Sequence, residues 1–214
     1  MTAAREAILA RVRAAVSGET AHPEPPAYRR GGEMARAEMG ARFVDRLDDY
    51  HVHVTAIGAA EDIATVVAAR LGVLSISQLV IPTGLPVAWR PPGVAVVEEA
   101  GLSNLALNGV ASALTSCALA IAETGTVVLD ASPGQGRRAV TLLPDHHICV
   151  VFAHQLVETV PQALQKLHAA AKAGRPLTFF SGPSATADIE FDRVVGVHGP
   201  RKLDVVFVGG APPS

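Results

Sequence analysis

Residues 158–181 read ETVPQALQKLHAAAKAGRPLTFFS, the pattern of a helix, a stop and a strand in succession. The helical face repeats at spacings of three and four residues through Val157, Val160, Leu164, Leu167 and Ala171. Gly174 is the stop, and an apolar run follows Pro176. A second continuous apolar run stands at residues 203–208. Continuous runs beside amphipathic helices are typical of a mostly parallel sheet with both faces covered, so the predicted fold class is α/β.

The alternation of strand and helix patterns extends toward the N-terminus. Residues 52–57 are strand-like and residues 63–71 are helical and amphipathic, which together predict a βα unit. Prolines and glycines at residues 82–93 predict an extended loop. Further strand-like runs stand at residues 75–81, 94–97, 118–122, 126–129, 139–143 and 148–152. We expect a mixed, mostly parallel sheet of about six to eight strands, several of them pairing locally.

Residues 1–50 differ from the rest of the chain and are predicted to form an N-terminal helical arm. Helical patterns at residues 1–18 and 33–47 are separated by a proline-rich stretch at residues 22–27. Residues 51–214 then make up the α/β domain. The first helix is punctuated by arginines and lacks the apolar run of a secretory signal, so we expect a cytoplasmic protein.

Composition excludes several classes of protein. A chain of 214 residues with 49% apolar and 18% charged side chains can bury a full single-domain core. A net charge of -2 gives no electrostatic basis for binding nucleic acid or anionic lipid. The uncharged stretch at residues 101–122 is interrupted by Asn104 and Asn108, so it is interpreted as core and not as a membrane span.

Metal and cluster chemistry is not expected in this chain. Two isolated cysteines are too few for a cysteine-ligated iron–sulfur cluster. His51 and His53 lie two apart, and His146 and His147 begin another strand-like run, but the sequence indicates no third ligand for either pair. We therefore predict no metal site and no cofactor bound by this chain.

Four polar, glycine-containing segments interrupt the strand-like runs and are the candidates for ligand binding. They comprise residues 123–126, 132–137, 181–190 and 198–201. In an open α/β sheet, ligands lie beyond the carboxyl ends of the strands, where glycines let backbone N–H groups approach an anion. We expect a pocket at one sheet edge, floored by the first segment and walled by the third, with Arg137 or His198 near its mouth.

The third segment is predicted to hold a small anion. Ser184 is placed to cap a short helix, which would leave the N–H of Thr186 facing outward at the positive end of the helix dipole. Ser181, Ser184 and Thr186 are the expected hydroxyl donors, and Gly182 is the permissive backbone. Asp188 is expected to orient a catalytic group. The alternative is a capped helix that binds nothing.

Glu123 is the first candidate for a catalytic residue. It follows the apolar run at residues 118–122 and precedes a Thr-Gly turn, a position at a strand end that suits a carboxylate to general-base or nucleophilic work. Thr124, Gly125 and Thr126 are assigned to the binding site beside it. The alternative is a hairpin turn in which the carboxylate only accepts hydrogen bonds from neighbouring N–H groups.

The loop of Gly134, Gln135, Gly136 and Arg137 is a candidate for contact with a phosphate or another anion. Its glycines permit close approach of the backbone, and Arg137, with Arg138 beside it, offers a bidentate fork. A dinucleotide fingerprint would need a third glycine and a following helix, so a simple hairpin turn is the alternative. His198, in a glycine-flanked turn, is a further candidate acid or base, or else a turn histidine bonded to backbone.

The polar segments occur in a definite order along the chain. They read IAETGT at residues 121–126, PGQGR at 133–137, SGPS at 181–184 followed by TADIE at 186–190, and GVHGP at 196–200. In this order and spacing, the chain resembles the lactate utilization protein C family over about residues 50–210. Residues 181–190 are the specific part of the pattern, whereas each shorter motif alone is weak.

The resemblance implies a LUD domain, a three-layer α/β/α fold similar to that of ribose-5-phosphate isomerase, glucosamine-6-phosphate deaminase and the CoA transferases. Members of the family are encoded with two partners, and the set supports oxidation of L-lactate to pyruvate. The partners carry iron–sulfur motifs. The resemblance therefore implies a subunit or accessory protein of an L-lactate-oxidising complex in lactate catabolism.

Two other functions stay open at this point, and with them the question whether the chain is an enzyme. The triplet at residues 123–125, Glu-Thr-Gly, is similar to the Glu-Asn-Gly of CoA transferases, with one residue of three different. That likeness would suit an independent enzyme on a small anionic substrate, a sugar phosphate or an acyl-CoA, with Glu123 as base or nucleophile. The other alternative is a non-catalytic module that senses a carboxylate.

Overall fold

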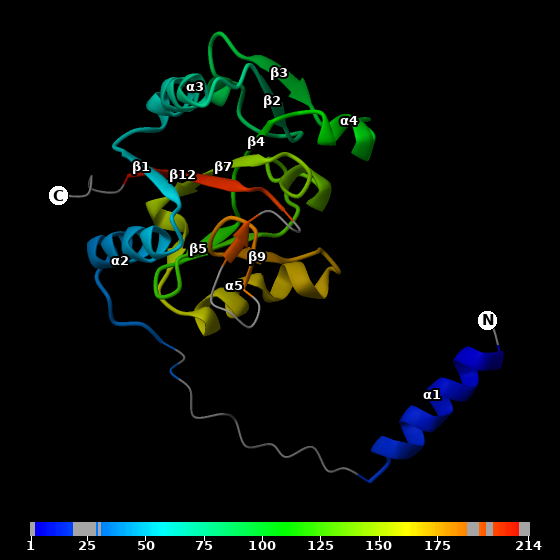
Figure 1. Ribbon diagram of the computed structural model, residues 1–214. Helices are drawn as coiled ribbons and strands as arrows, with labels where there is room; N and C mark the ends of the chain where they lie inside the picture. Colours follow the sequence, from blue (N-terminus) through cyan, green and yellow to red (C-terminus); the bar gives the residue numbers. More distant parts are fainter. Residues whose placement is uncertain (1–2, 19–28, 30, 188–192, 196–198, 210–214) are drawn as a thin grey trace.

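The computed structural model of the protein describes residues 3–18, 29, 31–187, 193–195 and 199–209. Within these ranges, six parallel strands form the central sheet (Figure 1). Their order across the sheet is β1 (His53–Ile57), β12 (Lys202–Val208), β7 (His146–Phe152), β4 (Ser112–Thr115), β2 (Gln78–Ile81) and β3 (Ala95–Glu98). Because every pair is parallel, all of these strands end at the same edge of the sheet.

A second, smaller sheet lies against the first. Its order is β8 (Leu156–Val157), β5 (Leu119–Ile121), β6 (Thr126–Leu129) and β9 (Thr178–Phe180). The local pairing of β5 with β6 agrees with expectation, but both strands belong to this second sheet and not to the main one. The tight turn at residues 122–125 folds β6 back antiparallel onto β5. A separate antiparallel hairpin joins β10 (Ala185–Ala187) to β11 (Arg193–Val195).

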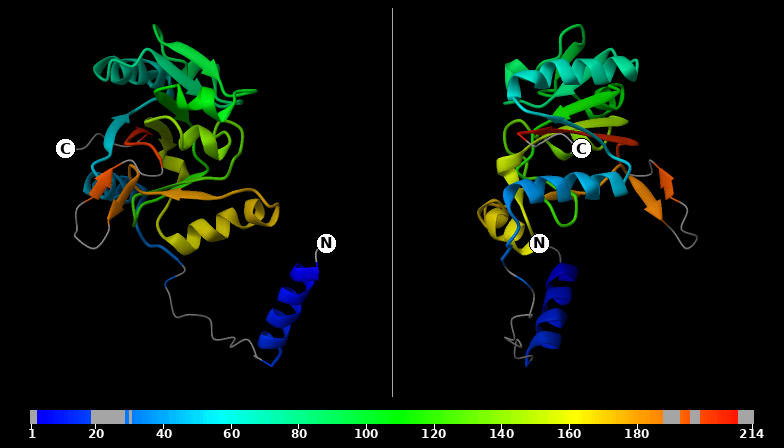
Figure 2. Two further views of the ribbon diagram at one scale, coloured as in Figure 1. Left: turned by 45° about the vertical axis from the view of Figure 1, so that its right-hand side comes forward. Right: turned by 90° about the vertical axis from the view of Figure 1, so that its left-hand side faces the viewer.

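Helices cover both sides of these sheets, which confirms the predicted α/β fold with a mostly parallel sheet (Figures 1 and 2). The helix α3 (Ile63–Val73) packs on one face of the main sheet. The second sheet and α2 (Arg36–Asp49) pack on the other face, and α5 (Val160–Lys172) covers the outer side of the second sheet. The short helices are α4 (Asn104–Asn108) and the 3-10 turns η1 (Ala60–Asp62), η2 (Val87–Trp89), η3 (Arg138–Thr141) and η4 (Ala153–Gln155).

The helix α5 begins and ends close to where the sequence predicts. Thr159 and Gln162 form a reciprocal capping box: the Thr159 hydroxyl accepts from the Gln162 N–H at 3.4 Å, and the Gln162 side chain accepts from the Thr159 N–H at 3.2 Å. At the other end, Gly174 adopts a φ of +73°, which stops the helix at little steric cost. The face containing Ala163 and Leu167 is buried against the second sheet.

The N-terminal segment contains two different kinds of helix. Phe43 and Leu47 of α2 are fully buried, and the Phe43 ring centroid lies 5.7 Å from that of Phe207 in β12. By contrast, α1 (Ala3–Val16) has no buried residue and lies apart from the rest of the described chain in both figures. The domain boundary at residue 50 stays a prediction, although α2 shares the core of the α/β domain. No helix within the described ranges combines the length and the apolar character needed to cross a membrane.

Two local predictions are wrong. Residues 139–143 were expected as a strand, but η3 occupies their start and buries Val140 against Leu107 of α4. A short apolar run does not distinguish a strand from a helical turn by periodicity. The helix expected after Ser184 is the strand β10, and the Ser184 N–H donates to the Pro200 carbonyl at 2.8 Å. Pairing with a neighbouring segment thus replaces the expected helix cap.

Candidate functional site

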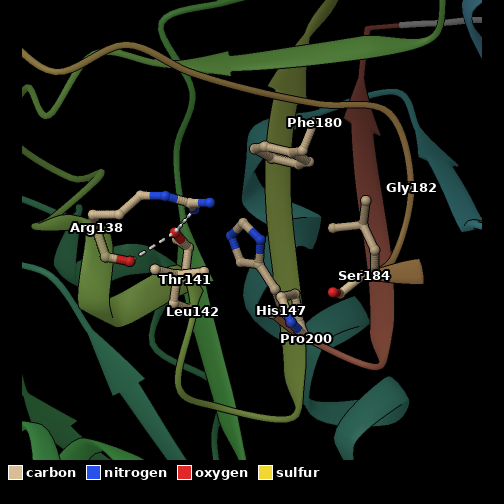
Figure 3. Close-up of a pocket in the computed structure, with 10 residues that line it drawn as sticks. Arg138, Thr141, Leu142, His147, Phe180, Gly182, Ser184 and Pro200 are labelled. Carbon is tan, nitrogen blue, oxygen red and sulfur yellow. Dashed lines mark hydrogen bonds between the residues drawn. The ribbon is translucent and has the colours of Figure 1, made fainter. Parts of the chain in front are cut away.

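A small pocket lies beside β7, between η3 and the segment that links β9 to β10 (Figure 3). Its volume is about 110 Å³. The polar and glycine residues of its lining, with the Phe180 ring, are Arg138, Thr141, His147, Phe180, Gly182, Ser184 and Gly199. Figure 3 shows Arg138 and Thr141 on one side of the His147 ring, and Gly182 and Ser184 on the other. Four separate stretches of the chain meet here, at residues 138–142, 147, 180–184 and 199–203.

Arg138 brings a positive charge to this pocket. Its Nη1 donates to the Thr141 hydroxyl at 3.2 Å, and that hydroxyl donates to the Arg138 carbonyl oxygen at 3.3 Å, which orients the guanidinium. Burial lowers the pKa of the Arg138 guanidinium, but arginine stays protonated in proteins. Among the described residues, no carboxylate pairs with it. The pocket is therefore bordered by an exposed cation for which the described residues supply no counter-charge.

His147 is the second titratable group of the pocket. Its Nε2 lies 2.8 Å from the Thr115 hydroxyl, and its ring centroid lies 5.5 Å from that of Phe180. Burial, then the charges of His146 and Arg138, lower the pKa of His147 to about 3, so the imidazole is neutral near pH 7. Its Nδ1 has no hydrogen-bond partner among the described residues. That nitrogen can accept or donate one further hydrogen bond, depending on the tautomer.

The opposite wall is held by close backbone packing. The hydrogen bond from the Ser184 N–H to the Pro200 carbonyl ties the β9–β10 link to the segment before β12. At Gly182 a Cβ atom would lie 2.8 Å from the Cβ of Tyr50, so the chain can pass Tyr50 this closely only as glycine. The close approach to Tyr50 gives a packing reason for glycine here, and the assignment of Gly182 to anion binding stays a prediction.

Three hydroxyls form a hydroxyl cluster, defined as Thr124, Thr126 and Ser181. The oxygens of Thr124 and Thr126 lie 2.7 Å apart, and those of Thr126 and Ser181 lie 2.8 Å apart. The cluster joins the β5–β6 turn to the end of β9, so the first and third polar segments do lie side by side. None of its three residues lines the pocket, however, although the neighbours of Ser181 on both sides, Phe180 and Gly182, do.

Glu123 belongs to a separate arginine–glutamate cluster, defined as Arg29, Glu123 and Glu158. Arg29 donates to Glu123 Oε1 at 3.0 Å and to Glu158 Oε1 at 2.7 Å. The side chain of Glu123 is 48% exposed, whereas that of Glu158 is only 3% exposed and also accepts the Met34 N–H at 2.8 Å. The structure thus places Glu123 at an ion pair with the N-terminal segment and not among the pocket-lining residues.

The loop at residues 134–137 is occupied by contacts within the protein. Gln135 accepts the Asp130 N–H at 2.6 Å. Arg137 donates to Asn104 at 2.9 Å and to a backbone carbonyl of the segment before α4. The two glycines of the loop have φ values of +82° and +73°, which explains glycine at both positions. These contacts fix the loop against α4 and place it outside the pocket lining.

The structure does not bring all of the predicted site residues together in one place. Gly182 and Ser184 line the pocket, and Ser181 joins the adjacent hydroxyl cluster. Thr186 lies in β10, while Asp188 and His198 lie outside the described residues. Their assignments stay predictions.

A buried polar network runs through the main sheet, on the side of α3. His146 Nδ1 lies 2.9 Å from the Ser112 hydroxyl, and His146 Nε2 lies 2.9 Å from Asp204, which also accepts from Arg70 Nε at 2.5 Å and Nη2 at 3.2 Å. Burial alone would raise the pKa of Asp204, but hydrogen bonds from His146 and Arg70 outweigh it and hold that pKa below its ordinary value. Ser112 is fully buried, so this arrangement stabilises the fold and offers no accessible nucleophile.

Within the described ranges, no three His, Cys, Asp or Glu side chains gather as metal ligands would. His51 has a φ of +59° and precedes β1, so it does not share a strand face with His53. Cys117 and Cys149 are both buried in the core, as small apolar side chains are.

Comparison with known proteins assigns the family. Residues 96–208 match the model of the LUD domain. A protein of Deinococcus radiodurans named Lactate utilization protein C is 42% identical over 203 residues, which are 94% of this chain and 94% of that protein. The chain belongs to the LUD-domain family. A relative of the same name from Halalkalibacterium halodurans is 33% identical over 77% of this LUD-domain chain and 70% of its own length.

A solved structure supports the same fold for this LUD-domain protein. The crystal structure of a DUF162 family protein from Deinococcus radiodurans is 40% identical in sequence, with a TM-score of 0.72. The match covers 83% of this chain and 100% of the other. Together with the layers described above, it confirms the fold expected from the sequence.

Several pocket residues of this LUD domain were missed by sequence reasoning. Thr141 lies in the run predicted as a strand, which gives no sign of a binding residue. Arg138 is indicated by the sequence beside Arg137, as part of the glycine loop and not of this pocket. His147 was considered only as half of a metal-ligand pair. Phe180 ends an apolar strand and gives no polar signal at all.

Proposed function

We propose that this LUD-domain chain works in lactate utilization, as a subunit or accessory protein of a complex that oxidises L-lactate to pyruvate. The observation that carries the proposal is the 42% identity, along 94% of both chains, with the protein named Lactate utilization protein C. A likeness over nearly the whole length includes the pocket, the main sheet and the N-terminal segment. It therefore supports a role for the entire chain and not for one motif.

The oxidation releases two electrons and two protons per lactate, and the electrons need an acceptor. We assign that acceptor to iron–sulfur clusters in partner subunits. The residues of this chain do not fit such a cluster, because it has only two cysteines, and both are buried among apolar core side chains. The contribution of this chain is then to the assembly or to the binding of the acid.

Deleting the gene tests the role in lactate utilization. We expect the deletion strain to lose growth on L-lactate as the sole carbon source and to keep growth on pyruvate. A plasmid copy of the full chain should restore growth. Wild-type growth on L-lactate without the chain would contradict the proposal.

Purification of a tagged full chain from lactate-grown cells tests the assembly. We expect partner chains to co-purify with iron and acid-labile sulfide, together with dye reduction that depends on L-lactate. A tagged chain that is recovered alone from such cells would contradict a place in the complex.

The same complementation assay tests the catalytic role predicted for Glu123. That role would require Glu123 to leave its pair with Arg29. If Glu123→Gln fails to restore growth while the variant keeps the thermal stability of the original protein, the carboxylate is required. Normal growth with this variant removes the proposal of a Glu123-dependent enzyme.

A further inference from the structure

We propose that the pocket beside β7 binds short monocarboxylates with an oxygen on C2, the chemical class of L-lactate and pyruvate. In this assignment Arg138 holds the carboxylate and His147 contacts the C2 oxygen. The choice of acid rests on the proposed function, whereas the site itself rests on the charges, hydrogen bonds and dimensions of the pocket.

The first argument is the charge of Arg138. Arg138 is exposed and also lines the pocket, so its guanidinium can be reached by a carboxylate from solvent. Among the described residues, the guanidinium has only the bond to Thr141, which leaves N–H groups for both oxygens of a carboxylate. The bond to Thr141 also holds the guanidinium in one orientation. A bound carboxylate would thus supply the missing counter-charge.

The second argument is the neutral imidazole of His147, whose ring lies beside the Arg138 side chain (Figure 3). His147 Nε2 is committed to Thr115, while Nδ1 has no partner in the described part of the chain. Because burial and nearby positive charge keep the ring uncharged, His147 suits an uncharged oxygen better than a second anionic group. Nδ1 can accept from the hydroxyl of a 2-hydroxy acid, and in the other tautomer it can donate to a 2-oxo group.

The third argument is size. A volume of about 110 Å³ is well below the roughly 300–1,000 Å³ typical of pockets for drug-sized ligands. Leu142, Phe180 and Leu203 add apolar surface suited to a methyl group. Arg138 is the cation among the described lining residues, so the pocket matches the single charge of a monocarboxylate better than the two charges of a phosphate. A three-carbon monocarboxylate agrees with both limits.

Calorimetric titration of the full chain with four matched compounds tests the proposal. L-lactate and pyruvate have both recognised groups, propionate lacks the C2 oxygen, and lactamide lacks the negative charge. We expect saturable binding of L-lactate or pyruvate at concentrations up to tens of millimolar. Lactamide should bind about tenfold more weakly or worse, and propionate several-fold more weakly.

Two variants separate the two contacts. Arg138→Gln should remove the preference for L-lactate over lactamide, because the cation is gone. His147→Gln should remove the preference for L-lactate over propionate, because glutamine can reach Thr115 but offers nothing at the position of Nδ1. Arg13→Gln, on the exposed helix α1, removes the same charge far from the pocket and should bind like the original protein.

Absence of saturable binding of both acids to the original protein would overturn the proposal, as would unchanged binding by Arg138→Gln. If a variant does not fold, the imidazole nitrogen resonances of His147 in the original protein give a second readout. They should shift when L-lactate is added and stay in place with lactamide. No shift with either compound would also overturn the assignment.

The binding experiments and the growth of the deletion strain test the site and the role in lactate utilization separately. Binding that follows this pattern, with normal growth of the deletion strain on L-lactate, would keep the site and contradict the role in lactate utilization. Loss of growth without any binding would keep the role and overturn the site.

Discussion

At the scale of single residues, the adjacent histidines His146 and His147 of β7 have different surroundings on the two faces of the main sheet. Side chains alternate along β7, so His146 faces the side of α3 and bonds to Asp204 and Ser112. His147 faces the other side, where it meets Thr115 and the pocket. The first is part of a buried polar network, and the second lines the pocket. Neighbours in sequence thus lie on opposite faces of the main sheet.

The acid dependence of stability should depend on His147. In the unfolded chain its pKa returns to an ordinary value of 6.5, whereas in the folded protein it is about 3. The unfolded state therefore binds more protons between these values, so stability is complete above about pH 6.5 and falls as the pH drops toward about 3, by at most about 1.4 kcal/mol per pH unit. His147→Phe should flatten this slope in urea unfolding at several pH values.

The matched control for this measurement is His168→Gln. His168 is exposed on α5, so this substitution removes one histidine from the chain and leaves the buried ring of His147 in place. An unchanged slope in His147→Phe would show that the buried ring is not the group that titrates.

Asp204→Asn should be among the most destabilising polar substitutions in this chain. It would leave Arg70, whose side chain is 24% exposed, without its carboxylate, and breaking a buried ion pair on one side costs about 3 kcal/mol or more. Asp49→Asn is the control, because its pair with Arg46 is exposed and worth about 0–1 kcal/mol. Chemical denaturation measures both, and equal losses would contradict the structural role of the Asp204 network.

At the scale of elements, the segment before α2 is fastened to the N-terminus of α5. Glu158 accepts from Arg29 and from the Met34 N–H, and it precedes the capping box of that helix. Gly32 passes so close to the Glu158 carboxylate that a Cβ atom would overlap it. This contact, and not local propensity, positions the chain that enters α2.

Gly32→Ala should loosen this segment, whereas Gly31→Ala should not. A methyl group at position 32 would collide with Glu158 from its Cβ to its carboxylate, while nothing lies within 4 Å of the corresponding position at residue 31. We expect a loss of about 1–3 kcal/mol and faster hydrogen exchange of the Met34 amide only in Gly32→Ala. Identical behaviour of the two variants would contradict the packing described here.

At the scale of the whole molecule, the described chain divides into a packed body and one helix that adds nothing to its core. The body buries apolar layers on both faces of the main sheet and a further layer beneath α5. The helix α1 exposes Ile8, Val12 and Val16, each more than half exposed. Its presence is therefore not needed to fold the body.

Removal of residues 1–17 should leave the melting temperature within about 2 °C of the original, a change below about 1 kcal/mol for a domain of this size. A longer deletion through residue 49 is the contrast, because it removes Phe43 and Leu47, whose loss costs about 2–5 kcal/mol each. Scanning calorimetry distinguishes the two. A large drop after the shorter deletion would show that α1 packs on the body.

Features that depend on interactions within a few residues could be predicted from the sequence, whereas features that depend on packing between distant segments could not. The α5 ends and the apolar β7 and β12 strands were predictable, because capping, glycine stops and periodicity act over a few residues. The separation of β5 and β6 into a second sheet was not, since either sheet can bury the same apolar run. Nor was η3, whose helical turn depends on packing against α4.

By itself, the amino-acid sequence determined the α/β class, the family and the segments rich in polar groups and glycine, because these are properties of local order and spacing. Only the tertiary structure decided which polar groups share a pocket. Arg138, His147 and Ser184 come from η3, β7 and the link after β9, and they meet because the main sheet and the second sheet pack face to face. The same packing places Glu123 in the arginine–glutamate cluster. The position of each turn depends on long-range strand pairing, which the local sequence does not show.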